Sequence, residues 1–409
     1  MQEGAADSSF ALAPFQAGSR DLTARLRPFV ALLCVCLGPV AAARAEEVKI
    51  EVLHGKREAR LIASGASFTE GPEARPLAQQ GGEGRALHRL LAGAGGLFLD
   101  GRAVLLPLTV HAGAEALVLD GRQLPGRVEV WAEKGALVVV NTLDLEDYVA
   151  AVVASEVPST WPRAALEAQA VAARTYAVAQ KVAQGPAARA HLGASVLDQV
   201  YGGAAHPASG ARLAARSTAG EVLTWGAAPI AAYFSSSCGG RSESGEAAFN
   251  LPMHSAPYLA VADDGDADAG APRRVWTVRL PLAKLSELLR TGGRPESPDG
   301  AKKPAPQLKS IAVASRTSSG RARTVTLFTA KGQRPLAAVE LRQLVGYNEL
   351  PSLFFSVEVR LGVAIFSGRG SGHGVGLCQW GARGRARRGE GYREILAHYY
   401  PGAEIRKMY

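Results

Sequence analysis

Tight-turn dipeptides between short apolar runs constrain the fold of this chain more than any other feature. Asp-Gly at 100–101 and 120–121 and Lys-Gly at 134–135 each separate two such runs. Dipeptides of this kind favour two-residue hairpin turns, and apolar runs this short match strands better than helices. The pattern therefore predicts β-structure from residue 48 to about residue 140.

A helical pattern begins at Asp144. The Asp144 carboxylate can cap a helix over 145–155, and Pro158 biases the residue before it to an extended conformation. A second helix is predicted to be capped by Ser159 or Thr160, with Pro162 in its first turn, and to run to about residue 184. Strand-like segments and a closing helix over 392–399 come later in the chain.

The length and composition predict more than one folded domain. Hydrophobic residues make up 47% and charged residues 20% of the 409 residues, which is typical of a folded globular chain too long for one ordinary core. We predict an α+β fold, with a β-rich N-terminal domain at 46–127 and a mixed α/β domain at 128–409. The proline-rich stretch at 291–308 is expected to be a loop or linker.

The N-terminus predicts export. Three arginines at 20–27 precede an apolar run at 29–40, and Ala-Arg-Ala follows at 43–45. This is the order of a cleaved signal peptide, and the run is too short to span a bilayer. We expect residues 1–45 to be removed, leaving no stable membrane span and a periplasmic, extracellular or cell-wall protein.

The charge of the chain favours an anionic partner. The net charge is +9, and about +8 remains without residues 1–45, which hold four Lys or Arg and three Asp or Glu. A cell-wall glycan with carboxylates fits an exported basic protein, whereas nucleic acid is not expected there. A basic surface that only aids solubility is the alternative.

Glu156 is the candidate catalytic residue. It shares the apolar face of the first predicted helix with Val149, Val152 and Val153. Burial and the negative end of a helix dipole both favour a protonated carboxyl, which a general acid needs. The N-terminus of the next helix could oppose this effect, and a salt-bridged or solvent-facing Glu156 is the structural alternative.

Polar residues on the second predicted helix and in two later loops are further candidates. Gln169 and Arg174 either reach a cleft or satisfy a buried carboxylate, and a structural Arg174–Glu pair is the alternative. The segment at 235–240 brings together hydroxyls, a thiol and glycines. The segment at 370–381 presents His373 among glycines and lacks the Lys-Ser/Thr ending of a phosphate-binding loop.

Ordered sequence blocks resemble the stage II sporulation protein D / LytB amidase-enhancer family. The blocks are NTLDLEDYVAAVVASEVP at 141–158, Trp-Pro at 161–162, AQAVAARTYA at 168–177, QVYGG at 199–203, SCGG at 237–240, GHGVGLCQWGA at 372–382 and HYYPG at 398–402. The resemblance covers roughly residues 128–409, which makes that region the expected catalytic domain.

The resemblance implies a lytic transglycosylase that cleaves peptidoglycan glycan strands stripped of stem peptides. The Glu of the family's Glu-x-Pro motif falls on Glu156. One acid/base carboxylate suffices, because the sugar's own 6-hydroxyl replaces water and leaves 1,6-anhydro-muramyl ends. The residues expected to line the substrate cleft are Gln169, Arg174, Ser237, His373 and Gln379. The alternative is a non-catalytic glycan-binding module that enhances a cell-wall amidase, which is also a candidate partner of the enzyme.

The resemblance also bears on metals and cysteines. Some family members hold zinc with one His and two Cys shortly before the QVYGG block, but 191–198 here contains His191 and no Cys. We therefore expect no metal and no cofactor; should zinc prove necessary, the first ligands to test are His191, Asp198 and His206. Cys238 and Cys378 are expected to lie close together, and a disulfide requires Cα atoms within ~7 Å.

Overall fold

The computed structural model describes residues 46–77, 85–194, 199, 201–204, 209–292 and 307–409. The predicted signal peptide at 1–45 and most of the predicted loop at 291–308 lie outside these residues. None of the described helices is long and apolar enough to cross a membrane.

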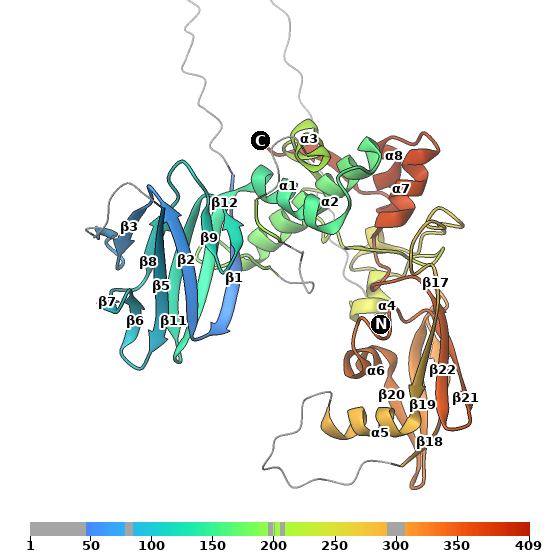
Figure 1. The fold of residues 1–409 in the computed structure, drawn as a ribbon. Helices are drawn as coiled ribbons and strands as arrows, with labels where there is room; N and C mark the ends of the chain where they lie inside the picture. The colour runs from blue at the N-terminus through green and yellow to red at the C-terminus, as the bar shows by residue number, and fades with distance from the viewer. Residues whose placement is uncertain (1–45, 78–84, 195–198, 200, 205–208, 293–306) are drawn as a thin grey trace, which may run out of the picture. The chain divides into compact units, whose positions relative to one another are not determined.

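The first part of the chain is built from strands, as predicted (Figure 1). They are β1 (Glu47–Lys56), β2 (Glu58–Ser64), β3 (Ser67–Glu70), β4 (Arg75–Pro76), β5 (Arg85–Gly93), β6 (Gly96–Leu99), β7 (Arg102–Val104), β8 (Leu108–His111), β9 (Leu117–Leu119), β10 (Arg122–Leu124), β11 (Arg127–Glu133) and β12 (Ala136–Asp144). One sheet has the order β13-β1-β12-β11-β8-β3-β4, with β13 at Leu192–Gly193, and the other has the order β10-β9-β2-β5-β6-β7.

The three predicted turns are confirmed. Asp100, Asp120 and Lys134 have φ values of 51°, 47° and 50°, and a glycine with positive φ follows each one. Two consecutive positive φ values are what a type I′ turn requires. Because β11 and β12 pair into the sheet that contains β1, we propose that the β-rich part ends at Asp144 and not at residue 127.

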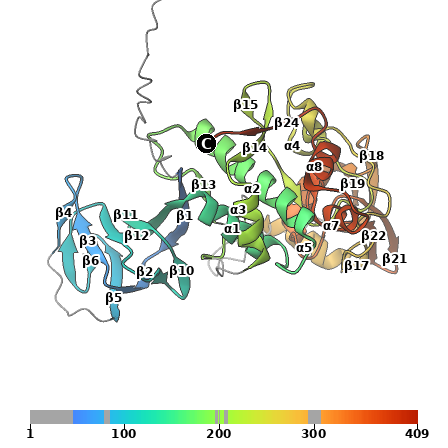
Figure 2. The ribbon, with the colours of Figure 1, turned by 90° about the horizontal axis from the view of Figure 1, so that it is seen from above.

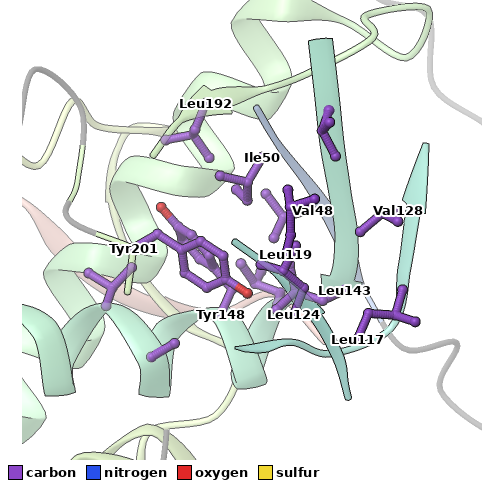
Figure 3. Close-up of a cluster of buried hydrophobic side chains, with 14 of the residues drawn as sticks. Val48, Ile50, Leu117, Leu119, Leu124, Val128, Leu143, Tyr148, Leu192 and Tyr201 are labelled. Atoms are coloured by element: carbon purple, nitrogen blue, oxygen red, sulfur yellow. The ribbon is translucent and has the colours of Figure 1, made fainter. Parts of the chain in front are cut away.

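One hydrophobic cluster joins the strands to the first helices. α1 (Leu145–Glu156) and α2 (Arg163–Gln184) contribute to the same buried cluster as β1 and β12. Figure 3 shows Tyr148 of α1 beside Tyr201, among Val48, Ile50 and Leu143. The two tyrosine hydroxyls are satisfied inside the core, because Tyr148 donates to Gln199 and Tyr201 donates to Asn141, both at 2.8 Å.

Local signals set the ends of α1, as the sequence predicts. The Asp144 carboxylate accepts from the backbone amides of Glu146 and Asp147, and Val157 before Pro158 is extended. α2 ends at Gln184, the predicted position, but its N-cap is Pro162 and not the predicted Ser159 or Thr160. α3 (Gly210–Ser217) packs against α1 and α2, as both views show (Figures 1 and 2).

The C-terminal part contains a second β-rich module with its own core. This core includes Trp276, Leu285, Val325 and Phe366. Its elements are β17 (Val275–Pro281), α5 (Leu282–Thr291), β18 (Leu308–Arg316), β19 (Ala322–Thr329), β20 (Gly332–Ala337), α6 (Ala338–Val345), β21 (Phe355–Arg360) and β22 (Val363–Arg369).

The remaining elements follow α2 in sequence. They are β14 (Glu221–Trp225), β15 (Ala228–Pro229), β16 (Phe234–Ser235), α4 (Gly245–Phe249), a 3-10 turn (Pro257–Leu259), β23 (Leu377–Cys378), α7 (Gln379–Arg387), α8 (Tyr392–Tyr399) and β24 (Glu404–Lys407). Among them, β14, β15, α7 and α8 contact α2. β16 pairs in parallel with β23, which brings the serine-rich and glycine-rich blocks together. The fold is therefore α+β, as predicted.

Candidate functional site

Glu156 lies at the C-terminal end of α1 and contacts a residue from the far end of the chain. Val149, Val152 and Val153 on the same helix face are completely buried, and Glu156 itself is half-buried. The Gln379 side-chain amide donates to Glu156 Oε2 at 3.1 Å. The fold thus joins two of the predicted site residues across 223 positions of sequence.

The start of α7 fixes the position of Gln379. Cys378 is the N-cap, and its sulfur accepts from the Gly381 amide at 3.3 Å. The Trp380 amide donates to the Ser236 carbonyl at 3.0 Å. Gln379 lies between these two anchored residues and is only 5% exposed, so its amide is held against Glu156.

Glycines let the loop before α7 pass through crowded space. A Cβ on Gly374 would lie 2.2 Å from Arg321, and one on Gly376 would lie 2.1 Å from the Tyr233 carbonyl oxygen. Both glycines also have positive φ. Substitution at either position would therefore displace the loop that leads to Gln379.

His373 faces an aromatic cluster at the edge of this loop. Its ring centroid lies 5.4 Å from that of Phe249 and 6.1 Å from that of Tyr233. Its Nδ1 accepts from the Val375 amide at 3.0 Å. Burial, with a smaller effect from the Arg342 guanidinium, lowers the pKa of His373 to about 4, so the ring is neutral near pH 7.

Arg174 is bound entirely to protein groups. Its guanidinium pairs with both Glu146 oxygens at 2.7 and 2.5 Å and donates to the carbonyls of Ala215 and Glu221 at 3.0 and 3.2 Å. The side chain is 0% exposed. This burial fits the alternative of a structural Arg174–Glu pair, because the guanidinium has no surface exposed to a ligand.

Ser237 is also committed to the protein. Its hydroxyl donates to Asp268 at 2.6 Å, and its backbone pairs with that of Ser371. Only 2% of the residue is exposed. Ser237 therefore lies in the protein interior with its hydroxyl bound to Asp268.

Gln169 is buried without satisfying its side chain. It is 2% exposed, and neither its amide oxygen nor its amide nitrogen has a hydrogen-bond partner among the described residues. An unsatisfied buried polar group costs about 1–3 kcal/mol of stability, so its presence in a protein calls for an explanation such as a bound ligand or water. Gln169 remains a candidate for binding a ligand group or a water.

Cys238 and Cys378 lie close together, as predicted, and both are free, buried thiols in this structure. The Cys238 amide donates to Cys378 Sγ at 3.2 Å. Burial, together with Cys238 and the carboxylates of Asp264 and Asp268, raises the pKa of Cys378 well above its ordinary value. The Cys378 thiol is therefore protonated at neutral pH.

Two places bear on metal binding. Donor atoms of Cys238, Asp268 and Cys378 lie within 4.8 Å of one another, the only such group in the described part of the chain. At the position that resembles the zinc variant, His191 Nδ1 accepts from the Lys49 amide at 3.2 Å. Asp198 and His206 lie outside the described residues.

The sequence motifs did not reveal an aromatic and cationic group beside the site. Trp161 and Trp380 pack edge to face with ring centroids 5.0 Å apart. The Arg383 guanidinium lies over both rings, at 4.8 Å from Trp380 and 5.6 Å from Trp161. Both tryptophans occur within the quoted blocks, but only the helical spacing in α7 could have pointed to Arg383.

Comparisons with known proteins agree with these motifs. Residues 133–225 match the family described as stage II sporulation protein, and residues 258–376 match a domain of unknown function, DUF8618. An uncharacterised protein of Brachyspira hyodysenteriae is 31% identical over 291 residues, covering 71% of this chain and 74% of that protein. The amidase enhancer of Bacillus subtilis is 29% identical, covering 62% of this chain and 39% of that protein.

A further relative covers most of its own length. Stage II sporulation protein D of Bacillus subtilis is 30% identical over 281 residues, covering 65% of this chain and 75% of that protein. The ordered motifs, the matched family and this coverage lead to one conclusion. The chain belongs to the stage II sporulation protein D family, which includes proteins named as amidase enhancers.

Proposed function

We propose that this protein is a lytic transglycosylase that cleaves peptidoglycan glycan strands with Glu156 as its single acid/base. The observation that carries this proposal is the contact between Glu156 and Gln379. Glu156 is half-buried at the C-terminal end of α1. Burial and the negative end of a helix dipole are general conditions that favour the protonated form of a carboxyl. General acid catalysis requires that protonated form.

The choice of Gln379 as partner suits this chemistry. The Gln379 amide orients the Glu156 carboxyl by donating a hydrogen bond to Oε2. Glu156 donates its proton to the glycosidic oxygen as the bond to C1 breaks. The resulting carboxylate then accepts the proton of the sugar's 6-hydroxyl, which closes onto C1 and leaves a 1,6-anhydro end.

Other parts of the site support substrate binding in this proposal. Gln169 has an unsatisfied amide, and His373 presents a neutral ring beside Phe249. Export to the periplasm, cell wall or medium, after removal of residues 1–45, remains part of the proposal. The strands acted on are proposed to lack stem peptides, and a cell-wall amidase is a proposed partner.

A non-catalytic role is the second candidate, because one relative is named as an amidase enhancer. A turnover assay separates the two roles. The purified chain without residues 1–45 is incubated with denuded glycan strands, and separately with intact peptidoglycan and a cell-wall amidase. The proposal predicts glycan cleavage without amidase, lost in Glu156→Gln. Amidase stimulation that persists in Glu156→Gln, without glycan cleavage by either protein, would favour the enhancer.

A further inference from the structure

Arg383 occupies an unusual position relative to Glu156. On α7, Gln379 and Arg383 are four residues apart, so they share one helix face with Cβ atoms roughly 5–6 Å apart. Helical side chains lean toward the N-terminus of their helix, which directs Arg383 toward Gln379. Because Gln379 contacts the Glu156 carboxyl, Arg383 lies about one helical turn from the residue that holds the proposed acid.

The Arg383 guanidinium is held in place by the two indole rings, but no carboxylate among the described residues pairs with its charge. Two nearby arginines are paired: Arg385 on α7 with Asp264 and Glu390, and Arg388 at the C-cap of α7 with Asp266. Among the described residues, no carboxylate lies within ion-pair distance of Arg383.

Stacking takes the place of an ion pair. The Arg383 guanidinium lies over the indoles of Trp380 and Trp161, and all three side chains are partly exposed. Stacking on aromatic rings occupies the face of a guanidinium and leaves the N–H groups on its edge available to a carboxylate.

Trp161 and Trp380 each lie near one of the two residues of the Glu156–Gln379 contact in the sequence. Trp161 follows Glu156 by five residues, and Trp380 is the residue after Gln379. Short stretches of chain therefore connect both tryptophans to the Glu156–Gln379 contact, and the Arg383 guanidinium lies over both rings. Indole rings offer apolar surface to the C–H faces of a sugar, and arginine matches a carboxylate with two parallel hydrogen bonds.

We propose that Trp161, Trp380 and Arg383 form a subsite for the free lactyl carboxylate of a muramic acid residue near the scissile bond. This inference rests on the proposed function and names the group by which stripped strands are selected. When a stem peptide is attached, the lactyl carbonyl is a neutral amide and cannot pair with Arg383. Preference for peptide-free glycan then follows from the chemistry of one contact.

The test compares two substrates that differ only at the lactyl group. The first substrate is denuded strands with free lactyl carboxylates. The second is the same strands after carbodiimide coupling to methylamine, which converts each carboxylate to an amide. The ratio of kcat/KM for the two is measured for the wild type, Arg383→Met and the control Arg334→Met. Arg334 is an exposed cation on β20, so its loss changes the net charge equally.

A hydrogen-bonded charge contact contributes about 1.5–3 kcal/mol, which corresponds to a preference of roughly 10- to 100-fold for carboxylate strands. Arg383→Met should bring this ratio close to one, Arg383→Lys should give an intermediate ratio, and Arg334→Met should keep the wild-type ratio. A folded Arg383→Met variant that keeps the wild-type preference overturns the inference.

Binding separates this inference from the proposed function. Dissociation constants for both kinds of strand are measured by calorimetry in the Glu156→Gln background, where no turnover is needed. Carboxylate preference that disappears on adding Arg383→Met supports the subsite even if the wild type cleaves nothing. Equal affinity for carboxylate and amide strands, together with normal cleavage, refutes the subsite and leaves the proposed function standing.

Discussion

Replacing Arg174 by methionine should strongly destabilise the chain. Methionine keeps an apolar stem of similar length but removes every donor that Arg174 gives to Glu146, Ala215 and Glu221. Glu146, with 21% of its side chain exposed, would keep only neutral donors such as the Tyr409 hydroxyl and the Gly220 amide. Breaking a buried ion pair by removing one partner costs about 3–5 kcal/mol.

The pH dependence of this loss has a definite sign. Burial raises the pKa of Glu146, but hydrogen bonding and charge from Arg174 outweigh it, and the net pKa is lowered. The pair therefore stabilises the fold above the unfolded pKa of about 4.5, and this contribution declines as the pH falls. The difference between wild type and Arg174→Met should be largest near pH 7 and smaller near pH 4.

Urea denaturation of the wild type, Arg174→Met, Glu146→Gln and the double variant measures these values. The two substitutions should couple by about 0.5–3 kcal/mol, because the double variant leaves no buried charge unpaired. The exposed control Arg334→Met should change the free energy of unfolding by less than about 0.5 kcal/mol. An Arg174→Met variant with wild-type stability but no activity would refute this reasoning and return Arg174 to the substrate site.

Three further predictions concern the surroundings of Glu156. Gly384→Ala should lower the free energy of unfolding, measured in urea, by about 1–3 kcal/mol, because the new Cβ would lie 1.9 Å from the Ala267 carbonyl oxygen. This loss is expected even though alanine favours helices more than glycine does. Unchanged stability would contradict the close contact between Gly384 and Ala267. Cys238 and Cys378 should resist a thiol reagent in the folded chain and both react after unfolding, whereas no reaction after unfolding would reveal a disulfide. As the pH falls from about 6.5 to 4, His373 takes up its proton in the unfolded chain before it does so in the folded chain, which lowers the free energy of unfolding of the wild type. His373→Gln should therefore lose less stability than the wild type over this range. An equal loss in both proteins would count against a buried neutral ring.

Local signals in the sequence predicted local structure well. Asp144 caps α1 and Pro158 follows its end because both effects depend on neighbouring backbone groups alone. The turn at 120–121 likewise depends on which residues tolerate positive φ. Such features do not require knowledge of the tertiary fold.

Contacts between distant segments were harder to predict. Helical spacing placed Arg174 beside Gln169, but it could not distinguish a cleft from a buried pair with Glu146, 28 residues away. α7 was not predicted, because Gly381 and Gly384 disfavour helix. Tertiary packing explains both glycines, since a Cβ on either would strike the segment that contains Asp264 and Ala267.

The most direct test of the account is the mass of the products released from denuded glycan strands by the wild type and by Glu156→Gln. The wild type should release fragments with 1,6-anhydro ends, each one water lighter than a hydrolysis product. Glu156→Gln should bind the strands but release these fragments about 10²–10⁴-fold more slowly, whereas Glu358→Gln, at a side chain 51% exposed, should match the wild type. Full activity in a folded Glu156→Gln variant, or reducing-end products from the wild type, would contradict the account.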